Sequence, residues 1–192
     1  SREATNKLAN IPHLFGERRY SNSPYIGLPR VSSENRKFIP IDFLDGTVAG
    51  DKLYVLLGGG LYHFGILSSS MHNAFMRLTA GRLESRYSYS NTIVYNNFPY
   101  PFMADDTDTK AEQARQSIAK AGQAVLDARE DYRKAEPKPT LAQLYNRYLV
   151  DPYPKLTKAH SEVDKAVDKA YGYKGNGSDE SRVEFLLKLL KG

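Results

Sequence analysis

The chain of 192 residues contains no cysteine. This absence excludes disulfide bonds, a thiolate zinc site and a cysteine nucleophile. No apolar run approaches the roughly 20 residues that a membrane-spanning helix needs. The polar start, SREATNKLANIPHLF, has neither an initiator Met nor the pattern of a signal peptide. We therefore expect a cytoplasmic protein without a membrane partner, and a chain cut from within a longer one. No metal site is expected either, because metal-ligand spacing is absent among the histidines at 13, 63, 72 and 160.

The charge of the chain is basic without being extreme, with a formal net charge of +5 and a pI of about 9.2. Residues 1–102 hold 11 Lys and Arg against 7 Asp and Glu, whereas residues 103–192 hold 16 against 15. The basic excess therefore lies in the first half, as in a surface that faces a polyanion. Many proteins that bind no nucleic acid share such an excess, so charge alone does not decide the function.

The first half has the composition of strands separated by turns. Runs rich in β-branched and aromatic residues predict strands at 38–43, 53–57, 61–67, 86–90 and 92–97. Gly58 to Gly60 is interpreted as the hairpin turn between the second and third of these strands. One embedded helix follows the serine caps Ser68 to Ser70, with apolar residues at helical spacing, and Gly81 is expected to end it.

The second half has the composition of helices. Two capping-box patterns, a threonine followed three residues later by Glu or Gln, open a long helix at 109–134 and a short one at 140–149. Further helices are expected at 154–171 and after the turn at 175–178. Charges of both signs alternate along these segments, which is typical of solvated helix faces.

Two short motifs resemble parts of a methyltransferase. The run LYVLL at 53–57 and the glycines that follow resemble a loop that binds S-adenosylmethionine, but such a loop must open a helix. Here the glycines precede another strand-like run, which favours a hairpin. Residues 97–100, Asn-Phe-Pro-Tyr, resemble the Asn-Pro-Pro-Tyr motif of amino-methyltransferases, with Phe98 in place of the first proline. Because both motifs fail in detail, we expect no complete catalytic domain and no catalytic or cofactor-binding residue in this chain.

The stretch GRLESRYSYS, at 81–90, carries the most specific chemistry. Its residues Glu84, Arg86 and Ser88 alternate, so an extended strand would present an acceptor, a forked donor and a hydroxyl on one face. Such a set suits base edges in a DNA major groove, because Glu accepts from cytosine N4 and Arg donates to guanine O6 and N7. The alternative interpretation is a solvated edge strand whose charges discourage aggregation.

Several long segments, in order, resemble one family: PYIGLPRVSSENRKFIPIDFLD (24–45), LYHFGILSSSMHNAFMRLTAGRLESRYSYS (61–90), IVYNNFPYPF (93–102) and KLTKAHSEVDKAVDKAYGYK (155–174). They are similar to the C-terminal part of the MmeI-like, type IIL restriction–modification enzymes. These enzymes are long single chains that carry a nuclease, an adenine-N6 methyltransferase, a target-recognition domain and a helical C-terminal domain. The resemblance implies that this chain is the later part of the recognition domain together with the helical domain.

The resemblance also implies which residues select bases. The segment that matches GRLESRYSYS places Glu84, Arg86 and Ser88 at base-reading positions, and a further one falls at Lys52 before the LYVLL run. The chain departs from the family pattern at Asp42, where Gly is common, and around residues 49–51. Side chains expected to meet the DNA backbone, which position a protein without reading sequence, are Arg30, Ser32, Ser33, Arg36, Lys37, Arg77 and Arg82.

Together these observations predict an α+β chain, with a β-rich recognition lobe at 1–102 that contains one embedded helix and an all-α helical bundle at 103–192. The expected function is sequence-specific recognition of double-stranded DNA. The expected partners are that DNA and the upstream methyltransferase domain of the same bacterial protein. No cofactor is expected in this chain, whereas the resemblance implies S-adenosylmethionine and Mg²⁺ for the parent. The alternatives are a protein-interaction or structural module that reads no DNA, and a small independent methyltransferase.

Overall fold

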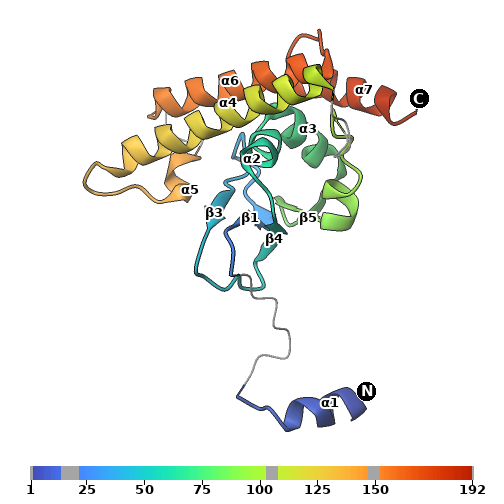
Figure 1. Cartoon of the computed structure of the whole chain (residues 1–192), viewed down its shortest axis with the longest axis vertical. Coiled ribbons are helices and arrows are strands. Elements are labelled where there is room, and N and C mark those ends of the chain that lie inside the picture. The colour runs from blue at the N-terminus through green and yellow to red at the C-terminus, as the bar shows by residue number, and fades with distance from the viewer. Residues whose placement is uncertain (1, 14–21, 103–107, 147–151, 192) are drawn as a thin grey trace.

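The computed structural model describes residues 2–13, 22–102, 108–146 and 152–191. Short antiparallel strands lie in the first half and long helices in the second, so the α+β class is confirmed. The strands are β1 (Tyr25–Pro29), β2 (Val31–Ser32), β3 (Asp42–Leu44), β4 (Leu53–Leu57), β5 (Gly81–Leu83) and β6 (Arg86–Ser88). The helices are α1 (Arg2–Ala9), α2 (Leu61–Leu67), α3 (Ser70–Thr79), the π-helical turn η1 (Asn91–Tyr95), α4 (Thr109–Arg133), α5 (Leu141–Leu144), α6 (Pro154–Tyr171) and α7 (Asp179–Leu189). Figure 1 shows the helices α4 and α6 above the strands.

The first sheet has the order β3-β1-β4, with every pair antiparallel. Its central strand β1 is covered on both faces, since Tyr25, Ile26 and Leu28 are all buried. Ile26 lies opposite Phe43 on one side and Leu56 on the other, which sets the register. The sequence predicted β4 correctly and β3 only in part, because residues 38–41 form no strand. It did not predict β1.

The second sheet has the order β2-β6-β5. Strands β5 and β6 form a hairpin that joins Gly81 to Ser88 and Leu83 to Arg86, and β2 pairs with the other edge of β6. The prediction that Gly81 ends the preceding helix is wrong, because helix α3 ends at Thr79 and Gly81 starts β5. The sequence therefore located the β6 strand but not the hairpin around it.

Residues 61–67 form helix α2, so the predicted strand there is wrong. Four consecutive residues, Phe64 to Leu67, are buried. In so short a run of apolar residues, the spacing of the apolar side chains does not distinguish a strand from a helix. Gly65 allows the helix to cross α4 closely, since a Cβ at this position would lie 2.6 Å from Ile118 Cγ2. Packing against α4 therefore stabilises residues 61–67 as a helix.

The predicted strand at 92–97 is also wrong, because residues 91–95 form η1. The N–H of Asn96 donates to the Asn91 carbonyl at 2.9 Å, five residues back. Ser90 Oγ accepts from the N–H of Ile93 at 3.3 Å, and the Asn97 amide donates to the carbonyls of Thr92 and Ile93. These local side-chain bonds satisfy the backbone and override the strand preference of the β-branched residues.

The helices of the second half begin and end close to the predicted positions. Asp108, not Thr109, caps α4 by accepting from Ala111 N–H at 2.7 Å. The capping box of Thr140 and Gln143 opens α5, which ends at Leu144, while residues 147–149 of the predicted helix lie outside the described residues. Helix α6 spans 154–171 as predicted, and α7 follows its Ser178 cap.

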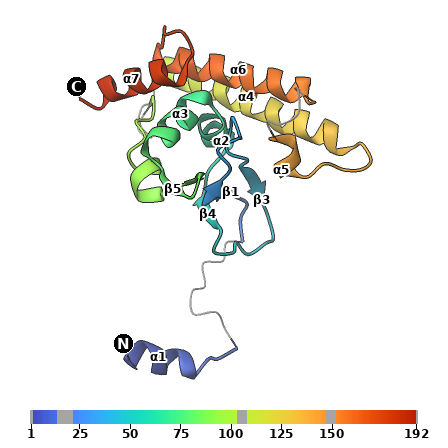
Figure 2. The same ribbon diagram turned by 180° about the vertical axis from the view of Figure 1, so that it is seen from behind.

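The second-half helices do not form a bundle closed on themselves. Helix α4 packs on α6 and α2, and α7 packs on α3 (Figure 2). One hydrophobic cluster contains Phe64 and Phe75 from the first half together with Ile118 and Val163 from the second. The lobe also holds more than the one predicted embedded helix, since α2, α3 and η1 all lie within it. The division of the chain into two domains at residue 102 stays a prediction.

Candidate nucleic-acid interface

Arg30 joins β1 to β2 and bonds to residues that adjoin β4 and β6. It is the single residue between β1 and β2, and its N–H donates to the Lys52 carbonyl at 2.9 Å. Its own carbonyl accepts from the N–H of Tyr89 at 2.8 Å. Lys52 precedes β4 and Ser88 ends β6, so the backbone of Arg30 brings two distant candidate base-reading positions to the same place.

The side chains of Arg30 and Lys52 are exposed, and each contacts a neighbouring residue. Its guanidinium donates to the Asp51 carbonyl at 3.1 Å and lies 5.3 Å from the centre of the Tyr54 ring. The Lys52 side chain is 86% exposed, with Nζ 3.0 Å from the Asp51 carboxylate. This hydrogen bond from Lys52 lowers the pKa of Asp51. An exposed ion pair of this kind contributes little to stability, so Lys52 is free to exchange its partner.

Glu84 lies in the turn between β5 and β6 and not on a strand face, which corrects the expected alternation. Its φ of 57° is left-handed, a conformation that hairpin turns require and that residues other than glycine seldom adopt. The Glu84 carboxylate nevertheless lies beside Arg86, with 2.6 Å between Oε2 and Nη2. The acceptor and the donor are therefore adjacent, but the turn and not the strand alternation brings them together.

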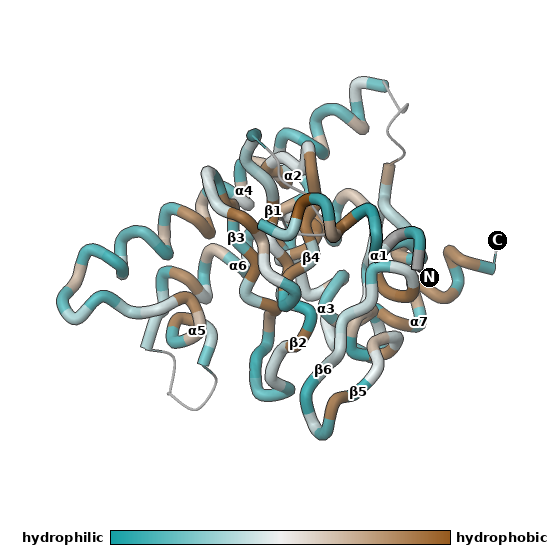
Figure 3. Tube along the Cα trace, turned by 90° about the horizontal axis from the view of Figure 1, so that it is seen from below, coloured by the Kyte–Doolittle hydropathy of each residue, from teal (hydrophilic) through white to brown (hydrophobic). Residues whose placement is uncertain are grey.

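The rest of the hairpin follows the predicted alternation. Tyr87 and Tyr89 are buried, whereas Arg86 is exposed and Ser88 half-buried. Figure 3 shows β2, β6 and β5 side by side, with hydrophilic residues at the turn between β5 and β6. The exposed hairpin turn and the Arg30 junction together define the candidate interface, whose predicted base-reading residues are Lys52, Glu84, Arg86 and Ser88.

Arg82 flanks this interface on β5. Its guanidinium lies 3.9 Å from the centre of the Tyr87 ring and donates to the Ser85 carbonyl at 2.8 Å. A carboxylate oxygen of Glu34 lies 3.9 Å from its Nη1. The side chain is exposed and held flat on the sheet, which suits a contact to a phosphate.

Ser33, Arg36 and Lys37 occupy the loop after β2. The N–H of Arg36 donates to the Ser33 carbonyl at 3.2 Å, which forms a turn. Arg36 is half-buried and Lys37 is exposed. Ser33 and Arg36 line a cavity of about 250 Å³ together with Gln143 of helix α5. The second-half helices therefore border the region where phosphate contacts were predicted.

Two predicted phosphate contacts are not positioned for that role. Ser32 is only 4% exposed, and its hydroxyl has no hydrogen-bond partner among the described residues. Arg77 donates to both carboxylate oxygens of Asp179, at 2.6 and 3.0 Å, and to the Lys37 carbonyl at 2.9 Å. Arg77 thus joins α3 to α7. Nothing in the sequence distinguished this structural arginine from an exposed one.

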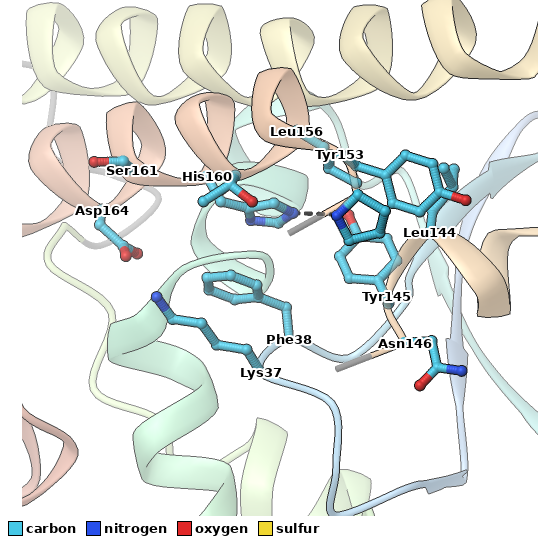
Figure 4. Close-up of a pocket in the computed structure, with 12 residues that line it drawn as sticks. Lys37, Phe38, Leu144, Tyr145, Asn146, Tyr153, Leu156, His160, Ser161 and Asp164 are labelled. Atoms are coloured by element: carbon cyan, nitrogen blue, oxygen red, sulfur yellow. Dashed lines mark hydrogen bonds between the residues drawn. The ribbon is translucent and has the colours of Figure 1, made fainter. Parts of the chain in front are cut away.

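A buried polar chain, which the sequence did not predict, lies beneath a cavity of about 490 Å³ between α5 and α6. Arg129 donates to the Tyr145 hydroxyl, which lies 2.7 Å from His160 Nε2, and His160 Nδ1 lies 3.1 Å from the Ser68 carbonyl. Figure 4 shows the bond between Tyr145 and His160, with Lys37 and Asp164 at the other end of the cavity.

Burial lowers the pKa of His160 to about 3. At neutral pH this imidazole is therefore uncharged. The Ser68 carbonyl can only accept a hydrogen bond, so Nδ1 carries the proton and Nε2 accepts from Tyr145. Both ring nitrogens and the Tyr145 hydroxyl are thus bonded, which indicates a structural network rather than a proton-transfer site.

The three glycines after β4 do precede a helix, so the sequence argument against a cofactor loop was wrong on that point. Gly60 caps α2, and its N–H donates to His63 Nδ1 at 3.3 Å. The strand before the loop belongs to an antiparallel sheet, whereas nucleotide loops of this kind lie in βαβ units with parallel strands. The loop therefore does not fit S-adenosylmethionine.

Among the described residues, no group of three His, Asp or Glu side chains lies close enough to hold a metal ion. No described helix has the length and apolarity needed to cross a membrane.

Comparison with known families covers almost all of the sequence. The profile described as "MmeI, target recognition domain" matches residues 1–102, and the profile described as "MmeI, C-terminal domain" matches residues 110–192. The chain belongs to the MmeI family. Its strands and hairpin lie within the part that matches the MmeI recognition domain, and helices α4 to α7 lie almost wholly within the part that matches the MmeI C-terminal domain.

Two individual relatives agree with the MmeI assignment. "DNA methyltransferase A" of Bacillus subtilis (strain 168) is 37% identical over 188 residues, which are 97% of this chain and 20% of that protein. The solved structure of the type IIL restriction–modification enzyme MmeI in complex with DNA has a TM-score of 0.83 and 37% identity, over 100% of this chain and 24% of that one. This MmeI-family chain therefore spans about a fifth to a quarter of the length of these relatives.

Proposed function

We propose that this chain is the DNA-reading region of a type IIL restriction–modification protein and that it binds double-stranded DNA in a sequence-specific manner. The observation that carries the proposal is the junction at Arg30, which brings Lys52, just before β4, and Ser88 of β6 beside the hairpin of Glu84 and Arg86. A two-stranded ribbon of this kind fits the width of a DNA major groove. The solved relative in complex with DNA supports the same function.

Glu84 and Arg86 are proposed to read one C·G base pair. Cytosine N4 and guanine O6 lie side by side across the pair in the major groove, so a reader needs an acceptor next to a donor. The 2.6 Å ion pair places the Glu84 carboxylate next to the Arg86 guanidinium. Both side chains are exposed, and binding would exchange their mutual bond for bonds to the two bases.

Backbone contacts are proposed for the exposed or half-buried members of the predicted set, namely Arg30, Ser33, Arg36, Lys37 and Arg82. Ser32 is left out because it is buried, and Arg77 because of its ion pair with Asp179. Such contacts position the protein and make its affinity depend on salt, with about one unit of slope for each phosphate neutralised.

The chemistry of the parent protein is proposed to lie outside this chain. Methyl transfer to adenine N6 would use S-adenosylmethionine, and cleavage would use Mg²⁺. The described residues fit neither group: the glycine loop belongs to an antiparallel sheet, and no cluster of carboxylates that could hold a metal ion lies among them. The upstream methyltransferase domain is the proposed intramolecular partner, and the bacterial cytoplasm the proposed location.

The test exchanges the two base-reading side chains in the full-length protein. The double variant Glu84→Lys with Arg86→Asp replaces the acceptor by a donor and the donor by an acceptor. We expect the preferred base pair at one position of the recognition site to change from C·G to G·C. Each lost base contact should cost about 1–3 kcal/mol of discrimination. Mapping of methylated sites in genomic DNA measures the result.

The matched control reverses an exposed ion pair outside the interface. Glu184 and Lys188 on α7 are 2.7 Å apart and 71% and 72% exposed, so Glu184→Lys with Lys188→Glu changes charge in the same way. This control should leave the recognition site unchanged. An active double variant at 84 and 86 that methylates the original sites would refute base reading by this pair and favour an interaction or structural module.

A further inference from the structure

The two faces of the β3-β1-β4 sheet differ in what covers them. Residues of one face, including Ile26, Phe43 and Leu56, belong to or pack on the hydrophobic core, and the Phe43 ring lies 5.6 Å from that of Phe64 on α2. Successive side chains of a strand point to opposite faces. The neighbouring positions therefore face outward, away from the helices.

This outward face is apolar at its edges. The register places Leu44 and Leu57 on either side of Tyr25, Asp42 and Val55 on either side of Gly27, and Leu53 opposite Pro29. Tyr25 and Gly27 of the central strand are buried, whereas Leu57 of the edge strand β4 is 61% exposed and Val55 37%. A Cβ on Gly27 would lie 2.8 Å from Leu44 Cδ1 and 3.7 Å from Leu53 Cδ1, so these two side chains cover the glycine. We call the four aliphatic side chains Leu44, Leu53, Val55 and Leu57 the outer sheet face.

An antiparallel sheet with one face on the core normally presents polar residues on the other. Here the outer sheet face has none of the cations that a DNA contact needs. Strand β4 pairs only with β1 among the described strands, so its second edge is open as well. A cluster of exposed aliphatic side chains beside an open strand edge marks a surface for protein contact.

We propose that the outer sheet face is the docking surface for an apolar segment of the same polypeptide that lies outside these 192 residues. MmeI-family relatives matched over nearly the whole of this chain are four to five times longer, since the chain covers 24% and 20% of them. The polypeptide also approaches the sheet at this place. It enters β1 at Tyr25, directly opposite Leu57, and α1 lies on the sheet side of the molecule, away from α4 and α6 (Figures 1 and 2).

The size of the surface favours an attached segment over a second copy. Only Val55 and Leu57 of the outer sheet face are exposed, and Leu44 and Leu53 are half-buried. A stable complex of separate chains needs about 800 Å² from each partner. A covalently attached segment is held at a high effective concentration and docks on a smaller area. The surface is therefore adequate within one polypeptide and too small for a dimer.

The test uses the full-length protein without DNA. Because this region has no cysteine, Leu57→Cys places a single thiol of the region on the outer sheet face, and peptide mass identifies it among any thiols elsewhere. Maleimide labelling should be at least tenfold slower in the folded protein than in urea. Leu83→Cys, at a side chain 49% exposed on the other sheet, controls for access of the reagent. A smaller reduction at position 57 would overturn the proposal.

The occupant is then identified by crosslinking. Benzophenone maleimide attached to the thiol of the Leu57→Cys variant, in an equal mixture of isotopically light and heavy protein, should join peptides of the same isotope from outside these 192 residues. Peptides of mixed isotope would indicate a second copy, and an absence of crosslinks would indicate an uncovered face; either result overturns the proposal. Val55→Cys, at a less exposed position, repeats the test if Leu57→Cys fails to fold. Neither variant alters the candidate interface, so failure here leaves the proposal of DNA reading standing.

Discussion

At the scale of single residues, the sequence indicated the chemistry of each candidate side chain, and the structure gave its position. The types of Glu84, Arg86 and Ser88 suggested base reading, but only the structure shows that Glu84 lies in a turn at a φ of 57°. The same holds for the arginines: Arg30 supports a junction of strands, whereas Arg77 is tied to Asp179. Residue type indicates what a side chain can bond, and the fold decides which bond is available.

Lys52 is predicted to read a guanine next to the pair read by Glu84 and Arg86. A lysine donates to guanine O6 and N7, and the small Ser88 leaves room for it. In the full-length protein, Lys52→Ala should weaken binding to DNA with guanine at that position by about 1–3 kcal/mol and leave the other three bases nearly unaffected. Binding titrations with DNA varied at that position measure this. A uniform loss would indicate a phosphate contact, no loss would retire the role, and Lys174→Ala, exposed between α6 and α7, is the control.

The left-handed backbone at Glu84 is predicted to lower the free energy of unfolding. A left-handed residue other than glycine costs about 1–2 kcal/mol, and glycine avoids this cost while losing about 0.4–1 kcal/mol through the unfolded chain. Glu84→Gly should therefore be more stable than Glu84→Gln by about 0.5–1 kcal/mol, because Gln keeps the backbone strain. Urea denaturation of both variants measures the difference. A glycine variant that unfolds more easily than the glutamine variant would contradict the strain argument.

At the scale of elements, α2 shows how packing overrides local preference. Its sequence, LYHFGIL, has strand-like composition, yet it folds as a helix because it crosses α4 at two glycines. A Cβ on Gly122 would lie 3.0 Å from the Leu61 carbonyl oxygen, and one on Gly65 would lie 2.9 Å from the Ile118 carbonyl oxygen. Close helix crossings of this kind leave no room for a methyl group.

Gly65→Ala is accordingly expected to lower the free energy of unfolding by about 1–3 kcal/mol, the usual cost of overpacking a core. Gly50→Ala is the matched control, because a Cβ at Gly50 meets nothing within 4 Å, and should change stability by less than about 0.5 kcal/mol. Thermal and urea unfolding of the two variants provide the comparison. Equal stability of both variants would show that α2 and α4 have room to separate.

At the scale of the whole molecule, the two halves share one core and one polar network. Arg129 of α4 donates to the carbonyl of Ile41 in the first half, and His160 of α6 lies 3.1 Å from the Ser68 carbonyl. The Phe38 ring stacks on His160, with centroids 4.0 Å apart. Buried hydrogen bonds between the halves hold the first half, which carries the β5–β6 hairpin, in a defined position on the helices.

Stability is predicted to fall in mild acid because of two buried histidines. Burial lowers the pKa of His72 and of His160 from 6.5 to about 3. The unfolded chain therefore binds more protons than the native one between pH 6.5 and about pH 3, so stability is complete above pH 6.5 and is lost as the pH falls. Each histidine should contribute about 1.4 kcal/mol per pH unit in this window.

Urea unfolding between pH 4.5 and 8 measures this dependence, and carboxylates add their own slope at the lower end. His72→Gln and His160→Gln each remove one titrating imidazole. Each variant should therefore show a shallower dependence of stability on pH between 5 and 6.5, whatever its absolute stability. A slope that stays the same in both variants would mean that these histidines are protonated without unfolding.

Local signals in the sequence were sufficient for much of the helical part. Pro154 at the first turn and Gly172 in the left-handed conformation mark the two ends of α6, and the capping box of Thr140 and Gln143 marks the start of α5. Caps and breakers act through bonds within a few residues. For that reason they can be recognised without knowledge of the rest of the fold.

The tertiary structure alone decided where distant segments meet. Strand β1 gains its neighbours β3 and β4 from later in the chain, α2 becomes a helix through α4, and Lys52 reaches Ser88 through Arg30. Each of these depends on contacts between residues far apart in sequence, whose energies no local pattern contains. The sequence by itself thus determined the helices of the second half and the side-chain chemistry of the candidate interface, whereas long-range packing determined the geometry in which that chemistry is presented.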